Sequence, residues 1–254
     1  PASTVVLLQN GMGVHDMLCE RLFYDADTRP HIVLANTTHG CFTKRPLHTV
    51  HAGFGSVYFG VVPNKCNSTV HDTCDVDAIP DTPELRTLRG TLALLLAMPL
   101  DVHWECIRDF QLRALRKLII NACVNPATAL VDCKNGELFG AGPAEELFRL
   151  VCTEASLVLE AHARHAKASG SDPAHAHKLA SLPLADLLTQ TDSEGMPLLD
   201  ASLRPASLLH EVERVVRATA ANWSSMHQDI RTGRASTEID YINGYLSELG
   251  RTYG

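Results

Sequence analysis

The sequence predicts an α/β region at the N-terminus followed by an all-α region. Apolar runs at residues 4–9 and 31–37 flank a stretch with helical apolar spacing, an order typical of a parallel β-α-β unit. From residue 83 onward the apolar residues recur at helical spacing in long segments. We therefore expect one domain over residues 1–82 and a helical domain over residues 83–254.

The first domain is expected to hold two parallel strands, a helix and a β-hairpin. Residues 4–9 predict a buried strand, and the glycine-containing turn at 10–13 leads into a helix over 14–23. The second strand covers 31–37. Residues 47–62 alternate in polarity and include several glycines, which predicts a hairpin that closes the sheet.

The second domain is expected to be built from long helices. Thr82-Pro83-Glu84 is a typical helix start, and one long helical pattern further on is interrupted only at Pro126. The predicted helices cover residues 85–97, 104–130, 144–168 and 207–223. Residues 169–206 contain several prolines and are predicted to be a looped insertion between helices.

Composition and charge exclude several classes of protein. A chain of 254 residues with 45% hydrophobic content can bury a substantial core. The net charge of −7, without a cluster of Lys and Arg, argues against nucleic acid as the main partner, whereas a small anionic ligand is compatible. The longest apolar stretch, residues 92–100, is far shorter than the roughly 20 residues of a membrane span. We predict no membrane crossing and, from the N-terminal residues, no secretion signal.

The eight cysteines contain no C-x-x-C pair, and we expect reduced, buried thiols in an intracellular protein. Cys66, His71 and Cys74 lie close together in the sequence, so a metal site has to be considered. Their spacing matches no standard zinc module, and we expect no metal. The histidine-rich residues 162–177 are better explained by a helix end and a solvated insertion than by a metal-binding tract.

A line of three polar residues stands out in the apolar run LRKLIINACVNP. Lys117, Asn121 and Asn125 are four residues apart, so on a helix they form a stripe about 12 Å long. An ammonium beside two amides in a cleft can hold and protonate a carbonyl compound. The alternative is a lysine that extends to solvent, with an ordinary helix end at the Asn before Pro126.

The turn at residues 10–13 is a second candidate site. Asn10-Gly11-Met12-Gly13 follows a parallel strand at its carboxyl end, where open α/β sheets bind ligands, and its glycines allow backbone amides to approach a ligand. The third glycine of G-x-G-x-x-G is absent, with Asp16 in its place, so this is not a first Rossmann turn. The alternative is a simple turn into a surface helix.

A third candidate lies near the C-terminus, in SSMHQDIR and the TEIDYING that follows it. Ser224 or Ser225 is expected to cap a helix, and a hydroxyl at a helix start is also a good carboxylate ligand. Glu238 is expected to stabilise the first turn of the next helix. If Glu238 lies near Lys117, it holds the lysine charged and directs it.

These segments occur together in a known order: QNGMG, NTTHG, LRKLIINACVNPATAL with NGEL after it, and SSMHQDIRTGRASTEIDYINGYL. The chain resembles the ketopantoate reductases (2-dehydropantoate 2-reductases). These enzymes pair an N-terminal NADPH-binding Rossmann domain with a helical domain similar to the C-terminal domain of 6-phosphogluconate dehydrogenase. The resemblance implies NADPH-dependent reduction of 2-dehydropantoate to pantoate, in pantothenate and coenzyme A biosynthesis.

The resemblance also implies roles on the substrate side. Lys117 would be the general acid that protonates the ketone oxygen. Asn121 would bind the substrate's hydroxyl or carbonyl oxygen, with Asn125 supporting it. Ser225 would bind the substrate carboxylate. Glu238 would orient Lys117 and the substrate hydroxyl, and so belongs to the catalytic set.

On the cofactor side, the resemblance implies that Asn10, Gly11 and Glu238 line the junction of NADPH and substrate. We expect a small keto acid as the partner, neither nucleic acid nor membrane, and a homodimer as the assembly to test. The expected compartment is the cytoplasm, with the mitochondrion as the alternative.

The sequence departs from the family pattern at several points. The family's opening strand and glycine fingerprint are expected upstream of Asn10 and are not in this sequence, which also stops short of the family's last helical segment. One extra residue separates Ser225 from Glu238, and insertions occupy residues 63–82 and 169–206. Residues 1–82 are thus expected to be the C-terminal part of a Rossmann domain. Two alternatives stay open, a non-catalytic binding or scaffold relative and a reductase of another 2-keto acid.

Overall fold

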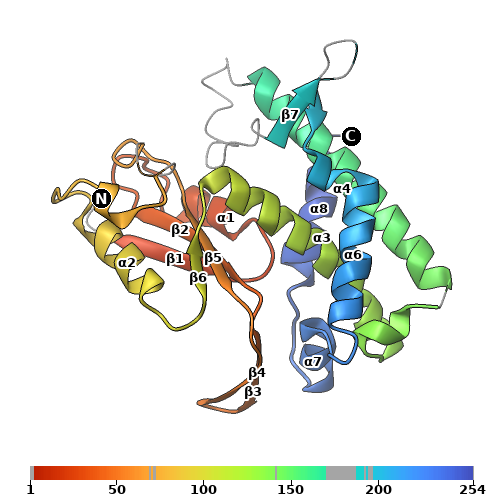
Figure 1. The fold of residues 1–254 in the computed structure, drawn as a ribbon. Helices are drawn as coiled ribbons and strands as arrows, with labels where there is room; N and C mark the ends of the chain where they lie inside the picture. The colour runs from red at the N-terminus through yellow and green to blue at the C-terminus, as the bar shows by residue number, and fades with distance from the viewer. Residues whose placement is uncertain are drawn as a thin grey trace. The chain divides into compact units, whose positions relative to one another are not determined.

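The computed structural model describes residues 3–68, 70, 73–140, 142–169, 187–191, 193 and 197–253. The chain divides into two compact units (Figure 1). The sheet unit comprises Pro1–Gln9 and Val14–Gln111, and the helical unit comprises Asn10–Gly13 and Leu112–Gly254. The short turn after the first strand therefore belongs to the unit that contains the predicted polar ladder.

The sheet unit is built on a four-stranded sheet of order β1-β2-β5-β6. β1 (Thr4–Leu8) and β2 (His31–Thr37) run parallel and are joined through α1 (Val14–Arg21). The predicted β-α-β unit is thereby confirmed. β5 (Val57–Val61) is antiparallel to β2, and β6 (Val102–Trp104) is parallel to β5.

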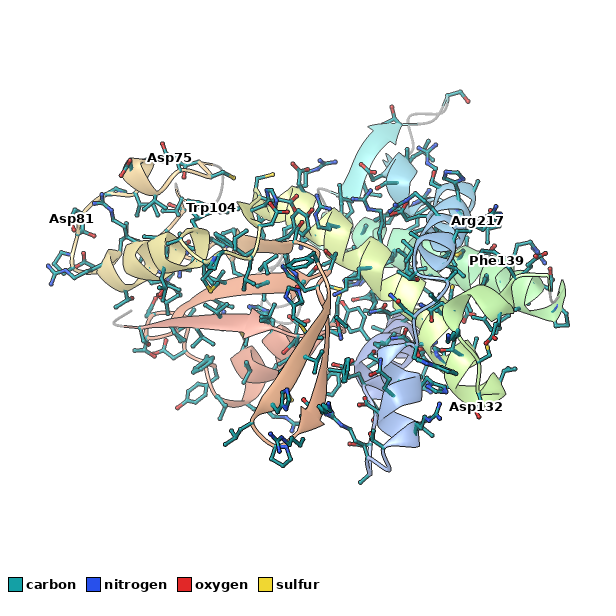
Figure 2. All side chains as sticks on the ribbon, turned by 60° about the horizontal axis from the view of Figure 1, so that its bottom comes forward. Asp75, Asp81, Trp104, Asp132, Phe139 and Arg217 are labelled. Atoms are coloured by element: carbon teal, nitrogen blue, oxygen red, sulfur yellow. The ribbon has the colours of Figure 1, made fainter. Side chains whose placement is uncertain are left out.

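One apolar core lies against this sheet. Alternate residues of β2 and β5 enter it because successive side chains of a strand point to opposite faces. α2 (Arg86–Leu96) adds Leu88 and Leu92, which are four residues apart and fully buried. Trp104, labelled in Figure 2, stacks on Phe59 with ring centroids 5.9 Å apart. The core residues are Val33, Ala35, Phe59, Val61, Val70, Ile79, Leu85, Leu88, Leu92 and Trp104.

The hairpin predicted over residues 47–62 is wrong. β3 (Gly40–Arg45) pairs with β4 (His48–Gly53) in a separate two-stranded sheet, which extends from the larger sheet in Figure 1, whereas β5 joins the main sheet. The chain changes sheet at Gly55, where a Cβ would lie 2.5 Å from the carbonyl carbon of Thr38. The alternation of polar and apolar residues continues through this turn. The sequence pattern therefore joined β4 and β5 into one predicted hairpin, although they belong to different sheets.

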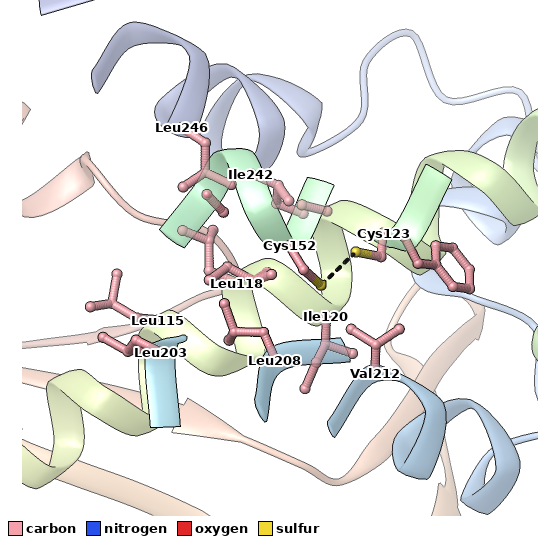
Figure 3. Close-up of a cluster of buried hydrophobic side chains, with 14 of the residues drawn as sticks. Leu115, Leu118, Ile120, Cys123, Cys152, Leu203, Leu208, Val212, Ile242 and Leu246 are labelled. Atoms are coloured by element: carbon pink, nitrogen blue, oxygen red, sulfur yellow. Dashed lines mark hydrogen bonds between the residues drawn. The ribbon is translucent and has the colours of Figure 1, made fainter. Parts of the chain in front are cut away.

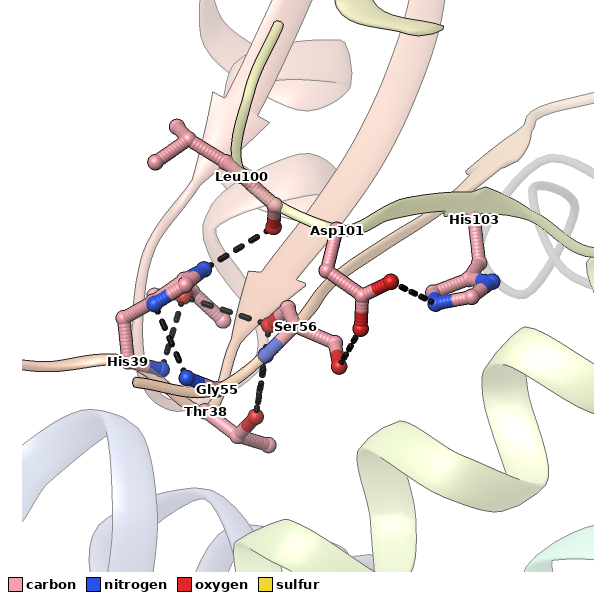
Figure 4. Close-up of polar contacts among 8 residues, drawn as sticks. Thr38, His39, Gly55, Ser56, Leu100, Asp101 and His103 are labelled. Carbon is pink, nitrogen blue, oxygen red and sulfur yellow. Dashed lines mark hydrogen bonds and ion pairs between the residues drawn. The ribbon is translucent and has the colours of Figure 1, made fainter. Parts of the chain in front are cut away.

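Polar contacts fix the base of this hairpin (Figure 4). His39 Nε2 donates to the Leu100 carbonyl at 2.9 Å, and His39 Nδ1 accepts from the Gly55 N–H at 3.0 Å. The Ser56 hydroxyl donates to Asp101, whose other oxygen lies 3.2 Å from His103 Nε2. The turn after β4 is therefore held to the loop before β6.

The division of the chain differs from the boundary expected at residue 82/83. Residues up to Gln111 group with the sheet. The reason is that α2 supplies core residues to the sheet and β6 extends it, although both lie in the stretch with helical apolar spacing. The long helix expected from residue 104 begins at Ile107, directly after β6.

Among the described residues of the helical unit, five helices pack around a second core, part of which is drawn in Figure 3. They are α3 (Ile107–Val131), whose first turn lies in the sheet unit, α4 (Gly142–Ser169), α6 (Pro205–Ala218), α7 (Ser225–Arg231) and α8 (Ile239–Tyr253). Short 3-10 helices cover Val76–Ala78 in the sheet unit and Asn135–Leu138 and Ala201–Leu203 in the helical unit. The centre of the core contains Leu115, Leu118, Ile119, Cys123, Phe148, Cys152, Leu208, Val212 and Ile242.

α3 continues through Pro126 without the predicted interruption. A proline has no N–H, so the carbonyl of Ala122, four residues earlier, has no donor within the helix. The Asn243 side chain on α8 takes that place, with its Nδ2 donating to the Ala122 oxygen at 3.1 Å. The helix therefore stays continuous because a second helix satisfies the orphaned carbonyl.

The insertion near residues 169–206 is described only in part. β7 (Leu188–Thr191) and β8 (Pro197–Leu199) form an antiparallel pair, so this otherwise helical unit also contains two short strands. Residues 170–186 lie outside the described residues, and with them most of the histidine-rich tract at 162–177.

All eight cysteines are free, but only Cys123 and Cys152 are buried, so the expectation of buried thiols is wrong for the other six. The two buried sulfur atoms lie 4.0 Å apart in the helical core (Figure 3).

The metal site considered at Cys66, His71 and Cys74 lies partly outside the described residues, because His71 is not among them. Among the residues that are described, no group of three or more His, Cys, Asp or Glu could hold a metal ion. No helix in the described part of the chain is long and apolar enough to cross a membrane.

Candidate active site

The polar ladder lies on α3 within the helical unit. Lys117 and Asn121 are partly buried, and Asn125 is only 6% exposed. The residues between them, including Leu118 and Cys123, enter the core. A solvent-facing stripe is therefore not what the structure shows, because the far end of the ladder is inside the protein.

Lys117 is connected to Glu238 through the side chain of Asn10. Lys117 Nζ donates to Asn10 Oδ1 at 3.0 Å, and Asn10 Nδ2 donates to Glu238 Oε2 at 3.1 Å. One amide thus uses its acceptor for the ammonium and a donor for the carboxylate. Residues from the turn, from α3 and from the segment just before α8 meet here.

The surroundings of Lys117 make its ammonium more acidic than usual. Burial lowers the pKa of Lys117 from 10.5 to about 8, and the charge of Glu238 opposes this by raising it. The lysine is therefore mostly protonated at neutral pH and releases its proton more readily than an exposed lysine. A proton donor in a hydride-transfer reaction needs both properties.

Gly11 is required by the way the turn docks on α8. The Met12 N–H donates to the Tyr241 carbonyl at 2.8 Å. A Cβ on Gly11 would lie 2.6 Å from the Cβ and from the carbonyl oxygen of Tyr241, and Gly11 has a φ of +79°. This contact holds Asn10 next to α8. The expected role of Gly11 in cofactor binding remains a prediction.

We expect Gly11→Ala to destabilise the protein by about 1–3 kcal/mol, because the new methyl group clashes with the backbone of Tyr241. Gly140→Ala is the matched control, since Gly140 has a φ of +81° and open space around its Cβ position. Urea unfolding of both variants separates the clash from the backbone strain that they share. An equal loss in both would contradict the docking argument.

The start of α7 separates the two serines. Ser224 is the cap: its Oγ accepts from the His227 N–H at 3.1 Å and from Thr128 Oγ1 at 2.7 Å. Ser225 is exposed, and its Oγ accepts a long hydrogen bond of 3.4 Å from Asn125 Nδ2. Because Ser224 does the capping, the Ser225 hydroxyl is available for a ligand beside the inner end of the ladder.

Sequence reasoning missed the residues that anchor α7. His227 is buried, and its Nε2 lies 2.7 Å from Oδ1 of Asp132, which follows α3 and is labelled in Figure 2. Trp223 stacks on the His227 ring with centroids 4.2 Å apart. These contacts add to the bond between Thr128 and Ser224, so both α7 and Ser225 are fixed against the end of α3. No local pattern in the sequence marks a contact between residues so far apart.

Asn135 is a further candidate that was only part of the matching NGEL segment. It is buried, and its Nδ2 donates to Thr219 Oγ1 at 3.0 Å. Its Oδ1 is buried and has no hydrogen-bond partner among the described residues. A buried acceptor without a donor calls for an explanation. The signal in the sequence was an Asn-Gly pair shortly after a helix.

The structure thus brings the predicted residues into two connected groups. Lys117, Asn10 and Glu238 form one, and Asn125 and Ser225 form the other. Asn121 lies on α3 between them. A set of donors beside an acidic ammonium suits an anionic compound with a carbonyl group.

Family models match both parts of the chain. The model described as "Ketopantoate reductase PanE/ApbA C terminal" covers residues 109–254, and "Ketopantoate reductase PanE/ApbA" covers residues 1–64. The first of these alone spans more than half of the chain.

Individual relatives agree with these matches. The chain is 30% identical to the probable 2-dehydropantoate 2-reductase of Schizosaccharomyces pombe over 99% of its own length and 62% of that protein. It is 27% identical to the 2-dehydropantoate 2-reductase of Saccharomyces cerevisiae over 97% of its length and 60% of that protein. The crystal structure of a probable 2-dehydropantoate 2-reductase from Bacillus subtilis matches with a TM-score of 0.60 and 25% identity, over 99% of this chain and 63% of that one. The chain spans less than two thirds of each of these relatives, and it belongs to the ketopantoate reductase family.

Proposed function

We propose that this chain provides the substrate-binding and proton-donating part of an enzyme that reduces 2-dehydropantoate to pantoate with NADPH. The observation that carries the proposal is the connected group of Lys117, Asn10 and Glu238. It places an ammonium of lowered pKa beside a carboxylate in the helical unit. The family membership supplies the reaction class.

Substrate binding is assigned to the inner part of the ladder. The Ser225 hydroxyl binds the substrate carboxylate, which accepts a hydrogen bond from it. Asn121 binds the carbonyl or hydroxyl oxygen, and Asn125 holds Ser225 and completes the ladder. This division is supported by the role of Ser224 as the helix cap, which leaves Ser225 for the ligand.

Proton transfer is assigned to Lys117. As negative charge develops on the ketone oxygen, the ammonium stabilises it and donates the proton in the same step. Asn10 and Glu238 keep the ammonium oriented. Removal of its proton leaves a neutral amine that regains a proton from solvent.

The nicotinamide cofactor supplies the hydride when it is bound. Asn10, Gly11 and Glu238 are the residues of this chain that we assign to its site. Asn10 Nδ2 has two N–H groups, one of which is directed at Glu238, and an amide donor of this kind suits a carboxamide oxygen. NADPH, rather than NADH, follows from the resemblance and is part of the proposal.

A panel of keto acids tests the proposed function. The protein, with any sequence that flanks residues 1–254 in its gene, is assayed with ketopantoate, 2-ketoisovalerate and phenylglyoxylate, each with NADPH and with NADH. We expect the highest kcat/KM for ketopantoate with NADPH. Equal rates with phenylglyoxylate would favour a reductase of another 2-keto acid. No turnover together with no binding of pantoate would favour a binding or scaffold protein.

Ser225→Ala sharpens this test. Loss of a hydrogen bond to a charged group is expected to raise KM for ketopantoate by about tenfold to a hundredfold. The matched control is Ser247→Ala, at an exposed position on α8. An unchanged KM in Ser225→Ala would remove Ser225 from the site.

Pantothenate and coenzyme A biosynthesis is the pathway that this reaction serves. The cytoplasm as compartment, a homodimer as assembly and a small keto acid as the ligand belong to the same proposal, since they follow from the resemblance.

A further inference from the structure

A second reactive cluster lies on α1 in the sheet unit. His15 Nδ1 is 3.1 Å from Asp16 Oδ1, and His15 Nε2 is 3.5 Å from the sulfur of Cys19. His15 and Cys19 are four residues apart, so they lie on the same side of the helix. The Cys19 thiol, the His15 imidazole and the Asp16 carboxylate thus form a chain in which the imidazole contacts both other groups.

The carboxylate decides which nitrogen of His15 carries the proton in the neutral ring. Asp16 accepts a hydrogen bond, so Nδ1 is the donor and Nε2 presents a lone pair to the Cys19 thiol. A base beside a nucleophile, itself oriented by a third group, is the arrangement that activates thiols in proteins. The proton can move from the sulfur to Nε2, and Asp16 then stabilises the imidazolium.

Burial and charge support the same assignment. His15 is only 5% exposed, whereas the Asp16 side chain is 47% exposed. Burial lowers the pKa of His15, but the hydrogen bonds to Asp16 and Cys19 outweigh it, and the pKa is raised to about 9. His15 is therefore cationic at neutral pH, and Cys19, which is partly exposed, faces a positive charge.

We propose that Cys19 is a reactive thiolate, paired with the imidazolium of His15, and that it is a modification site for small disulfides. With oxidised glutathione, the Cys19 thiolate attacks one sulfur and forms a mixed disulfide. The original disulfide bond breaks, and the second glutathione leaves as a thiolate. This thiolate takes the proton that His15 received from Cys19, so the products are the modified protein and one reduced glutathione.

Two other cysteines, Cys41 and Cys133, serve as internal standards. Cys41 is exposed on β3. Cys133 is partly exposed, and burial together with the nearby Glu137 and Asp132 raises its pKa. Accessibility alone would make Cys41 react faster than Cys19, whereas the proposal predicts that Cys19 reacts faster than Cys41.

The test measures mixed-disulfide formation at each cysteine with oxidised glutathione at pH 7, by mass spectrometry of peptides after timed quenching. An ordinary thiol is about 3% ionised at this pH. Transfer of the Cys19 proton to His15 raises the thiolate fraction, but the lower nucleophilicity of an acidic thiolate offsets most of this gain, so we expect a rate about threefold higher. We expect Cys19 to exceed Cys41 and Cys133 by this factor. A Cys19 rate no higher than that of Cys41 would overturn the proposal.

Variants identify the cause. His15→Gln and Asp16→Asn are expected to slow Cys19 to the rate of an ordinary thiol or below it, whereas His48→Gln on β4 is the matched control and should leave it unchanged. Asp16 is half-exposed, so its variant remains informative if His15→Gln fails to fold. Thiolate absorbance at 240 nm, wild type minus Cys19→Ser at pH 7, gives a measure that does not depend on access. No such difference, or a rate unchanged in Asp16→Asn, would contradict the ion pair.

Discussion

Replacing Lys117 with methionine is expected to lower kcat/KM for the reduction of ketopantoate by about three orders of magnitude. The variant removes the proposed proton donor, and general acid catalysis contributes about 10²–10⁴-fold to a rate. It also removes the positive charge that is expected to stabilise the developing alkoxide. The loss should fall mainly on kcat, since we propose that Ser225 and the asparagines of the ladder bind the substrate. Steady-state kinetics with NADPH measures it.

A folding defect would not explain such a loss. The pKa of Lys117 is lower in the folded protein than its ordinary value of 10.5. Below pH 8 the buried charge of Lys117 therefore lowers the free energy of unfolding. Methionine carries no charge, so urea unfolding at pH 7 should show that Lys117→Met is as stable as the wild type or more stable. The control is Lys44→Met on the exposed hairpin β3–β4. Normal turnover in Lys117→Met would refute the assignment of the acid.

The rate of reduction is expected to fall as the pH rises through about 8. Only the protonated lysine donates a proton, and its pKa in the free protein is about 8. On the alkaline side kcat/KM therefore drops by about tenfold for each further pH unit. A profile that stays flat up to pH 10 would show that this lysine is not the group that donates the proton.

Glu238→Gln tests the origin of this pKa. The charge of Glu238 raises the pKa of Lys117, so its removal should move the alkaline limb to lower pH. Glu248→Gln, at an exposed position on α8, is the matched control and should leave the limb in place.

The stability of the wild type should also rise between pH 8 and 10.5, because the unfolded lysine still binds a proton there while the folded one releases it. Lys117→Met should lack this rise.

The first elements of the fold could be predicted from the sequence because each is marked locally. The apolar runs at residues 4–9 and 31–37 appear as β1 and β2. The expectation that both are buried holds for β2 but is wrong for β1, which is only partly buried and has Leu8 55% exposed. The hairpin could not be assigned, because alternating polarity tells which residues form strands but not which sheet they join. The division of the structure differs from the expected boundary for a similar reason, since α2 has the spacing of any amphipathic helix and the sequence does not show which core it joins.

The candidate site was predictable in part. The ladder of Lys117, Asn121 and Asn125 follows from spacing alone, since residues four apart share one side of a helix. The contact of Asn10 with Glu238 joins the two ends of the chain, and no local pattern contains it. The resemblance implied only that both residues line the junction of cofactor and substrate. The anchors of α7, His227 and Asp132, lay beyond both kinds of reasoning.

Pro126 has a consequence for how the two halves of the site are kept in register. An alanine there would donate its own N–H to the Ala122 carbonyl, and Asn243 of α8 would compete with that hydrogen bond. The proline instead leaves the Ala122 carbonyl oxygen without a donor from α3. The Asn243 side chain of α8 donates to this oxygen, which ties α8 to α3 at this level. Glu238 precedes α8 and Asn125 precedes Pro126. The hydrogen bond between Asn243 and Ala122 thus helps to fix the distance between the Glu238 carboxylate and the polar ladder on α3.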